Sequence, residues 1–373
     1  MRKAMCSDRS GSRPSCRVPL HLTVVPVLAL WTWAGADVFT VTADRATGSE
    51  RPDGEVVIDL EGNVMVTDGE VVVTSRTGTV WQQSGHAVFE EDVFVESDTL
   101  TAEADRLDYR SSEGLIWLVG NVTLSDGDNV LTADEVTWFR DRGKATAKDS
   151  VVMTGPWLGR VTGDYAMYDK SRGSLFVTAN PVLYREENGD SMVVRADRLE
   201  FFPDDNRAEA QGNATVEVPA RELWAEADYL KYFGDQERFE LLGSPLVTSP
   251  DGELSGDWMS IAYSGGAISS VSVEGGAAGR FVDHGLSPPS RSGFSAERAV
   301  FHFSGSGDLD SIFVEGSVQL EVKSGGEAAQ NDERNTVRGD RLYVSYENGR
   351  PTNMVVSGGV SGTYSYRGSP PSR

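Results

Sequence analysis

The sequence predicts an elongated all-β protein built from about ten repeats of roughly 30 residues. Three patterns predict this fold. A small residue followed by an acid recurs along the chain, apolar and polar residues alternate after it, and a glycine follows 15 to 19 residues after most of the acids. Sustained alternation indicates half-buried strands, and a fixed repeat period indicates that similar units stack on one another.

The dipeptide of a small residue and an acid marks one position in each repeat. It begins with Ala43-Asp44, and a gap after it leaves room for one degenerate repeat near Thr77. The later acids are separated by 29, 30, 33, 31, 29, 40 and 43 residues, in Ala104-Asp105, Ala133-Asp134, Gly163-Asp164, Ala196-Asp197, Ala227-Asp228, Gly256-Asp257, Ala296-Glu297 and Gly339-Asp340. We expect the acids to lie on turns or sheet rims and to accept backbone hydrogen bonds, and a calcium-binding ladder is the less favoured alternative.

Positions two and four after the acid are mostly apolar, whereas the positions between them are often polar. Leu199, for example, lies between Arg198 and Glu200. Because side chains alternate between the two faces of a strand, the apolar set faces inward and the polar set is solvated. The residues predicted to form this inner ladder are Trp81, Leu107, Tyr109, Val136, Trp138, Tyr168, Leu199, Phe201, Leu230 and Tyr232.

The recurrent glycines lie inside the second extended run of each repeat. They are Gly62, Gly120, Gly212, Gly243, Gly275, Gly316 and Gly358. Three of them precede asparagine, in Gly62-Asn63, Gly120-Asn121 and Gly212-Asn213. Since glycine weakens a strand unless the strand must kink, we predict that the chain bends here from one sheet into a facing one.

Residues 1–36 have the features of a signal peptide. A basic segment precedes an apolar run from Val18 to Trp33, and Ala34-Gly35-Ala36 fits a cleavage site before Asp37. An uncleaved membrane anchor is the alternative. The two cysteines, Cys6 and Cys16, both lie in this leader, so the mature chain must be held together by its core.

The remainder reads as one body rather than several domains. Repeats fill residues 37–362, and residues 363–373 are expected to be a disordered tail. The two longest spacings hold polar, glycine-containing insertions at 283–290 and 323–335. The repeat resumes in phase after each insertion, so neither is a domain linker.

Composition narrows the function. The chain has 34 Lys and Arg against 57 Asp and Glu, a net charge of −23. Removing the leader leaves 29 and 56 and lowers the charge to −27. Such a surface disfavours nucleic acid as a partner. The histidines of the mature chain, His86, His284 and His302, are widely spaced, and no nucleophile, phosphate-loop or zinc pattern occurs. We therefore expect no catalytic residues, no metal site and no cofactor.

The repeats carry a family resemblance. Leu131–Trp138 and the Gly120-Asn121-Val122 run resemble the OstA-like repeat of the LptA-type lipopolysaccharide-transport family, and the resemblance extends over nearly all of the mature chain. The family fold it implies is an elongated antiparallel β-jellyroll, in which two sheets fold like a taco around an apolar groove. The chain is about twice as long as the short bridge protein of that family, and it lacks room for the barrel of the family's translocon.

The resemblance also implies a function. The protein would be a periplasmic bridge that shields lipid acyl chains with its inner ladder during transport to the outer membrane. Its partners would be lipopolysaccharide or a similar glycolipid, transport components of the inner and outer membranes, and further copies of itself joined head to tail. The alternatives are a membrane-anchored LptC-like relative, a parallel β-helix enzyme acting on polysaccharide, and a surface or adhesive repeat protein. For any single inner residue, core packing is the simpler role.

Overall fold

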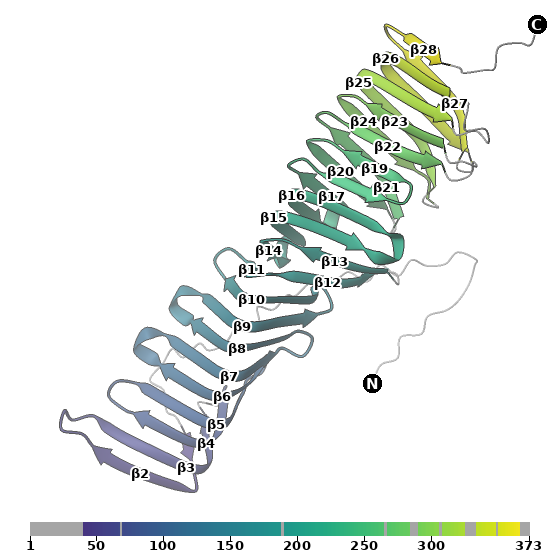
Figure 1. Cartoon of the computed structure of the whole chain (residues 1–373). Helices are drawn as coiled ribbons and strands as arrows, with labels where there is room; N and C mark the ends of the chain where they lie inside the picture. The colour runs from purple at the N-terminus through teal and green to yellow at the C-terminus, as the bar shows by residue number, and fades with distance from the viewer. Residues whose placement is uncertain are drawn as a thin grey trace, which may run out of the picture.

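The computed structural model describes residues 40–67, 69–187, 190–264, 267–283, 290–305, 308–324, 333–347 and 350–365. These residues form an elongated stack of antiparallel strands that follow one another in sequence order from one end of the body to the other (Figure 1). The described part holds 28 strands in one continuous sheet and, apart from short 3-10 turns, no helix. The predicted all-β class is confirmed.

Long strands build the first half of the body. Each pairs with the strand before it and the strand after it along nearly its whole length. They are β3 (Val56–Thr67), β4 (Val72–Trp81), β5 (His86–Glu96), β6 (Thr101–Arg110), β7 (Leu115–Ser125), β8 (Val130–Phe139), β9 (Lys144–Gly155) and β10 (Gly159–Asp169). Every pairing between these strands shifts register near the middle of the strand, so each strand bends there.

Shorter strands dominate the second half. They are β11 (Ser174–Thr178), β12 (Val182–Glu187), β13 (Asp190–Arg195), β14 (Arg198–Phe202), β17 (Arg238–Leu242), β18 (Leu246–Ser249), β19 (Gly252–Ser255), β20 (Trp258–Ser264), β21 (Ala267–Glu274), β22 (Ala278–Asp283), β23 (Ser290–Ser295) and β24 (Arg298–Phe303). Four long strands lie among and after them: β15 (Arg207–Val218), β16 (Leu223–Phe233), β25 (Leu309–Ser324) and β26 (Glu333–Glu347). Each long strand spans the combined length of two short ones; β10, for instance, pairs with both β11 and β12.

Split strands also close both ends of the stack. β1 (Thr40–Thr42) and β2 (Arg45–Glu50) pair only with β3, and β27 (Arg350–Ser357) and β28 (Ser361–Ser365) pair only with β26 among the described residues. Within the part of the chain that the structure describes, nothing pairs with their outer edges.

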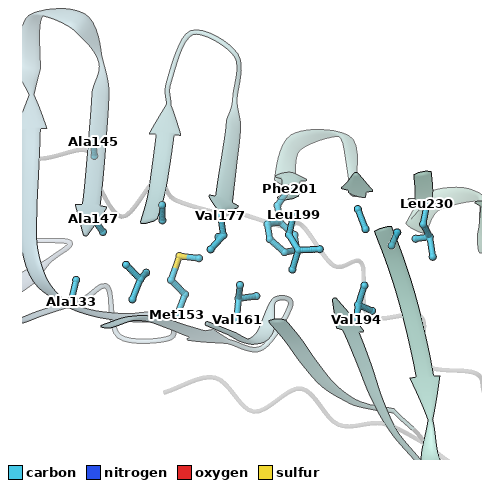
Figure 2. Packing of buried hydrophobic residues seen from close by; sticks show 14 of the residues in the cluster. Ala133, Ala145, Ala147, Met153, Val161, Val177, Val194, Leu199, Phe201 and Leu230 are labelled. Carbon is cyan, nitrogen blue, oxygen red and sulfur yellow. The ribbon is translucent and has the colours of Figure 1, made fainter. Parts of the chain in front are cut away.

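The bends fold the sheet into two facing walls. We call wall A the part that holds Leu107 and Tyr109, and wall B the part that holds Ala102 and Leu124. Apolar side chains from the two walls point toward one another (Figure 2): Leu199 and Phe201 come from wall A, Met153 and Val161 from wall B. Each wall ends in a row of turns at its outer margin. Lip A, the margin of wall A, consists of the turns at 110–115, 139–144, 169–174, 202–207 and 233–238. Lip B, the margin of wall B, consists of the turns at 96–101, 125–130 and 155–159.

Two sequence expectations are corrected here. All pairings between described strands are antiparallel, so the parallel β-helix is wrong. Strand β28 runs to Ser365, three residues into the segment expected to be a disordered tail. The leader at 1–36 and most of both insertions, 284–289 and 325–332, lie outside the described residues. Within the described part, no helix has the length and apolarity needed to span a bilayer.

Candidate functional site

The bend that creates the two walls is built from the repeated acid and the repeated glycine. At one such junction, Gly120 of β7 has φ +80°, a conformation that glycine adopts without steric cost. The carboxylate of Asp105 in β6 covers it so closely that a Cβ on Gly120 would lie 2.2 Å from the Asp105 Oδ2 atom. Asn121 donates from Nδ2 to the same oxygen at 2.9 Å. The acid and the glycine are therefore two halves of one junction.

The same contact recurs through the stack. A Cβ atom added at each of the other junction glycines would lie 2.2 to 2.6 Å from the paired acid; the pairs are Gly62 with Asp44, Gly212 with Asp197, Gly243 with Asp228, Gly275 with Asp257, Gly316 with Glu297 and Gly358 with Asp340. The prediction that the chain bends at these glycines is confirmed. The expectation that the acids lie on turns or rims is wrong, because they lie at the bends inside the sheet, where the glycine needs a carboxylate partner.

The small residue before each acid occupies the floor of the space between the walls. Ala104 and Ala133 are buried there, and a Cβ on Gly163 would lie 2.6 Å from the Cγ1 atom of Val177. A larger side chain at this position would force the walls apart. Close packing at the bend therefore explains why only alanine and glycine precede the acids.

A continuous apolar ladder follows wall A. Cross-strand register joins the predicted residues to apolar residues of the strands between and after them. In order, the ladder is Tyr109, Ile116, Trp138, Ala145, Tyr168, Leu175, Phe201, Ala208, Tyr232, Phe239, Ile261, Val271, Phe301, Ile312 and Val344. The residues that the sequence pattern missed come from the strands between the predicted ones. Pairing each glycine-containing run with the strand before it in antiparallel register would have predicted that they are buried.

The predicted inner residues lie where expected, with one exception. Leu107, Tyr109, Val136, Trp138, Leu199, Phe201 and Leu230 are buried in the core. Tyr168 is half-buried against the core, and Tyr232 is half-buried beside Phe239. Burial raises the pKa of the Tyr168 phenol. Whether any of these residues contacts lipid stays a prediction.

Trp81 is the exception. The bend in β4 lies at Ser75 and Arg76, one residue earlier than the degenerate repeat suggests, so Val80 and not Trp81 aligns with Tyr109 through Ala87. Trp81 instead stacks on His86 at lip A, with ring centroids 4.5 Å apart, and from there it still lines the N-terminal trough. The sequence pattern gave the wrong register here because the degenerate repeat lacks the acid. Arg76 occupies the position of the acid and pairs with Asp92.

The outer face also differs from expectation. Glu200 was predicted to be solvated, but it is only 3% exposed. Its carboxylate lies 2.9 Å from the guanidinium of Arg198 and 3.4 Å from that of Arg172. Asp108 in the first half is buried to the same extent, beside His86, Arg106 and Arg110. Long arginine side chains from neighbouring strands cover these carboxylates.

The space between the walls is not uniform. At the N-terminal end an open trough of about 950 Å³ is lined mainly by apolar residues, including Val41, Leu60 and Leu107. Further along, between β8 and β14, the space narrows to a cavity of about 120 Å³ with almost entirely apolar lining. This geometry suits hydrocarbon. Among the described residues, no group of three or more His, Cys, Asp or Glu side chains is arranged to hold a metal.

Comparison with known proteins identifies the first part of the body. Residues 40–144, which cover the trough, match the model of the family described as LptA/(LptD N-terminal domain) LPS transport protein. This segment is similar to that family. The assignment confirms the LptA-type resemblance and supports a role in lipopolysaccharide transport.

Among solved structures, the chain matches LptH, the LptA homologous periplasmic component of the lipopolysaccharide transport device from Pseudomonas aeruginosa. The identity is 15%, the match covers 36% of this chain and 75% of LptH, and the TM-score is 0.19. No curated protein sequence matches the chain.

Proposed function

We propose that the protein binds the acyl chains of lipopolysaccharide or a similar glycolipid between its two walls and shields them from water in the periplasm. The observation that carries this proposal is the apolar ladder, which runs without interruption from Tyr109 to Val344 and opens into the N-terminal trough. Each exposed acyl methylene costs about 0.8 kcal/mol in water, so a chain of a dozen costs on the order of 10 kcal/mol.

The family assignment of residues 40–144 supports the same proposal. We infer that the leader is removed before Asp37 and that the polar headgroup of the lipid stays outside the lips, among water and cations. An uncleaved leader would instead give a membrane-anchored form. Mass spectrometry of the exported protein distinguishes the cleaved form from the anchored form, because only the anchored form retains residues 1–36.

Lipid bound to the purified protein tests the proposal directly. Organic extraction followed by mass spectrometry should recover lipid A or a related acylated glycolipid. Two exposed neighbours in β1 provide a matched pair, since Val41 lines the trough and Thr42 lies on the opposite side of the strand. Val41→Asp should lower the recovered lipid by about tenfold, equivalent to about 1.4 kcal/mol, and Thr42→Asp should leave it unchanged. Equal lipid content in both variants, or none in the wild type, would count against the proposal.

The free edges at both ends support head-to-tail assembly into a longer bridge. Unpaired backbone groups on an edge strand invite a strand from another chain. An N-terminal edge meeting a C-terminal edge is a heterologous contact, so it generates open rods rather than a closed dimer. Met354 and Val355 are exposed on β27, and the exposed trough residue Val41 lies at the other end.

The edge can be tested with two neighbouring substitutions. Along β27, successive backbone N–H groups point alternately toward β26 and toward the free edge. Proline removes the N–H group, so one of the two variants Met354→Pro and Val355→Pro loses a hydrogen bond to β26 (the ladder variant), and the other loses a donor on the free edge (the edge variant). We expect the edge variant to stay folded and to lower the mass seen by light scattering to that of the monomer. The ladder variant should lower the melting temperature. A wild-type protein that is monomeric at every concentration would leave a lipid shuttle as the better account.

A further inference from the structure

The β9–β10 turn, residues 156–158, has an unusual composition for a turn on lip B. It carries Trp157 and Leu158 at its tip, whereas the preceding turn on the same lip carries Asp126, Gly127 and Asp128. Both apolar side chains are half-buried and line the narrow cavity between β8 and β14. The turn therefore leans over the space between the walls and roofs it.

A direct contact joins this turn to the opposite lip. The indole Nε1 of Trp157 donates to the Oδ1 atom of Asn206 at 3.1 Å, although the two residues are 49 positions apart. Asn206 follows the 3-10 turn Pro203–Asp205 on lip A. The Trp157 ring also packs edge-on against Phe201 of wall A, with centroids 6.1 Å apart. The turn thus crosses the mouth of the groove from wall B to wall A.

Both ends of this crossing are positioned by further contacts. On lip B, the guanidinium of Arg185 donates to the backbone carbonyl of Trp157 at 3.4 Å. On lip A, the Nδ2 atom of Asn206 donates to Asp235 at 2.9 Å, which directs the Oδ1 atom of the amide toward the indole. Gly234 leaves the room that Asn206 needs, because a Cβ there would lie 2.4 Å from the amide group.

Such a crossing affects lipids with and without a headgroup differently. A lipid whose chains lie between the walls and whose headgroup lies outside must keep its linkage in the slot between the lips. A residue that joins the two lips interrupts that slot. A single hydrocarbon chain has no such linkage and can pass beneath the crossing.

We propose that the β9–β10 turn is a strap that closes the groove at mid-length and must open for a headgroup-bearing lipid to pass. The inference rests on the proposed acyl-chain binding and adds a gate to it. Among the described residues, one hydrogen bond and one ring contact hold the strap across the lips, together with the apolar packing of Trp157 and Leu158, so few polar interactions must break for it to open. Cavity size agrees with a closed state, since the space under the strap is about one eighth of the trough.

A reversible cross-link tests the gate. Trp157→Cys and Asn206→Cys are introduced together in full-length protein that also carries Cys6→Ser and Cys16→Ser, which removes the two native thiols. A bis-methanethiosulfonate reagent then joins the lips, and dithiothreitol releases them in the same sample. Radiolabelled lauric acid serves as the chain without a bulky headgroup, and radiolabelled lipid A serves as the chain with one. Each single-cysteine variant, treated with the same reagent, is the control.

The cross-linked protein should take up lauric acid to within about twofold of the released protein and take up lipid A about tenfold less. A milder variant, Trp157→Phe, keeps an aromatic ring at this position but lacks the indole donor, and it should take up lipid A faster than the wild type. Equal lipid A uptake before and after release would overturn the strap while leaving the proposed function intact. If the released protein takes up lauric acid but no lipid A, both proposals fail. Thermal melts of each sample verify that the body is folded.

Discussion

The two halves of the body form the same two walls, but they build them from strands of different length. From β3 to β10 each strand passes unbroken through both walls, whereas from β11 to β24 most strands are split into one piece per wall. The acid–glycine junction is nevertheless retained in both halves. In continuous strands β6 and β7, a Cβ on Gly120 would lie 2.2 Å from Asp105 Oδ2, and between the split strands, a Cβ on Gly275 would lie 2.4 Å from Asp257 Oδ2. The junction, rather than strand continuity, therefore sets the angle between the walls.

Proline explains part of the difference. Pro181 and Pro245 come directly after the bends at Ala179-Asn180 and Gly243-Ser244, and both are buried. Proline has no N–H group to donate to the ladder, so the strand must stop before it. The first half has valine at the corresponding position, as Val122 shows, and its strands continue.

The largest expected effect tests whether the inner face is equivalent in the two halves. Leu107 in continuous β6 and Leu199 in split β14 are 1% and 2% exposed and occupy the same repeat position. Changing either to aspartate buries an unpaired carboxylate and removes apolar contacts, so each should lower the free energy of unfolding by about 4 kcal/mol. Denaturant titration measures the change. A loss at Leu199 much smaller than that at Leu107 would show that the split half is less tightly packed.

The junctions provide the next test. Gly120→Ala and Gly243→Ala each place a Cβ at positive φ, 2.2 Å and 2.4 Å from the partner carboxylate. We expect each change to cost about 3 kcal/mol from backbone strain and the clash. Adding Asp105→Gly to the first and Asp228→Gly to the second should recover part of that loss. No recovery in either double variant would mean that the acid does not set the conformation of the glycine.

The outer face offers a third matched pair. Asp108 and Glu200 are both buried among cationic side chains, one in each half. Asp108→Asn and Glu200→Gln keep the shape of each side chain and remove one buried counterion from the neighbouring arginines; Arg106 and Arg110 still pair with Glu90 and Glu113. Each should lower the unfolding free energy by about 2 kcal/mol. Thermal unfolding measures the change. A loss of unfolding free energy below about half a kcal/mol would mean that solvent already screens the charges of these arginines.

A smaller, pH-dependent effect is expected at the border between the halves. Asp169 at the end of β10 accepts hydrogen bonds from Ser171, at 2.6 Å from the hydroxyl, and lies 3.0 Å from the Lys144 ammonium. Ser171, followed by Lys144, lowers the pKa of Asp169 to about 2.

Because that pKa lies below its unfolded value, the carboxylate stabilises the fold above pH ~3.9, and the contribution disappears as the pH falls through about 2. Asp169→Asn should therefore cost about 1–2 kcal/mol at neutral pH and nothing at pH ~2. Unfolding curves across this range measure the difference between the two proteins. A constant difference at all pH values would contradict the ionic origin of the effect.

The smallest effect concerns strand continuity itself. Pro245→Val gives the second half the residue type that follows the bend in the first half. We expect the unfolding free energy to change by less than about 1 kcal/mol, because the restored donor is offset by greater freedom of the unfolded chain. Hydrogen exchange should show a protected amide at position 245 if β17 and β18 join. An exchanging amide there would mean that something other than proline splits the strands.

Some features follow from the sequence alone. Period-two alternation placed Leu107, Tyr109 and Phe201 on the inner face correctly, and the recurring glycines marked the bends. These properties are local, since alternation and the need for positive φ depend on a residue and its immediate neighbours.

Only the tertiary structure decided which residues meet across strands. The contact of Asp105 with Gly120 spans 15 positions, the burial of Glu200 depends on Arg172 from a neighbouring hairpin, and Trp157 meets Asn206 across the mouth of the groove. In the degenerate repeat, a one-residue difference in the position of the bend moved Trp81 off the inner ladder. The physical reason is register: side chains change face at every residue of a strand, so a pattern that lacks its acid cannot fix which face a residue takes until the neighbouring strands are in place.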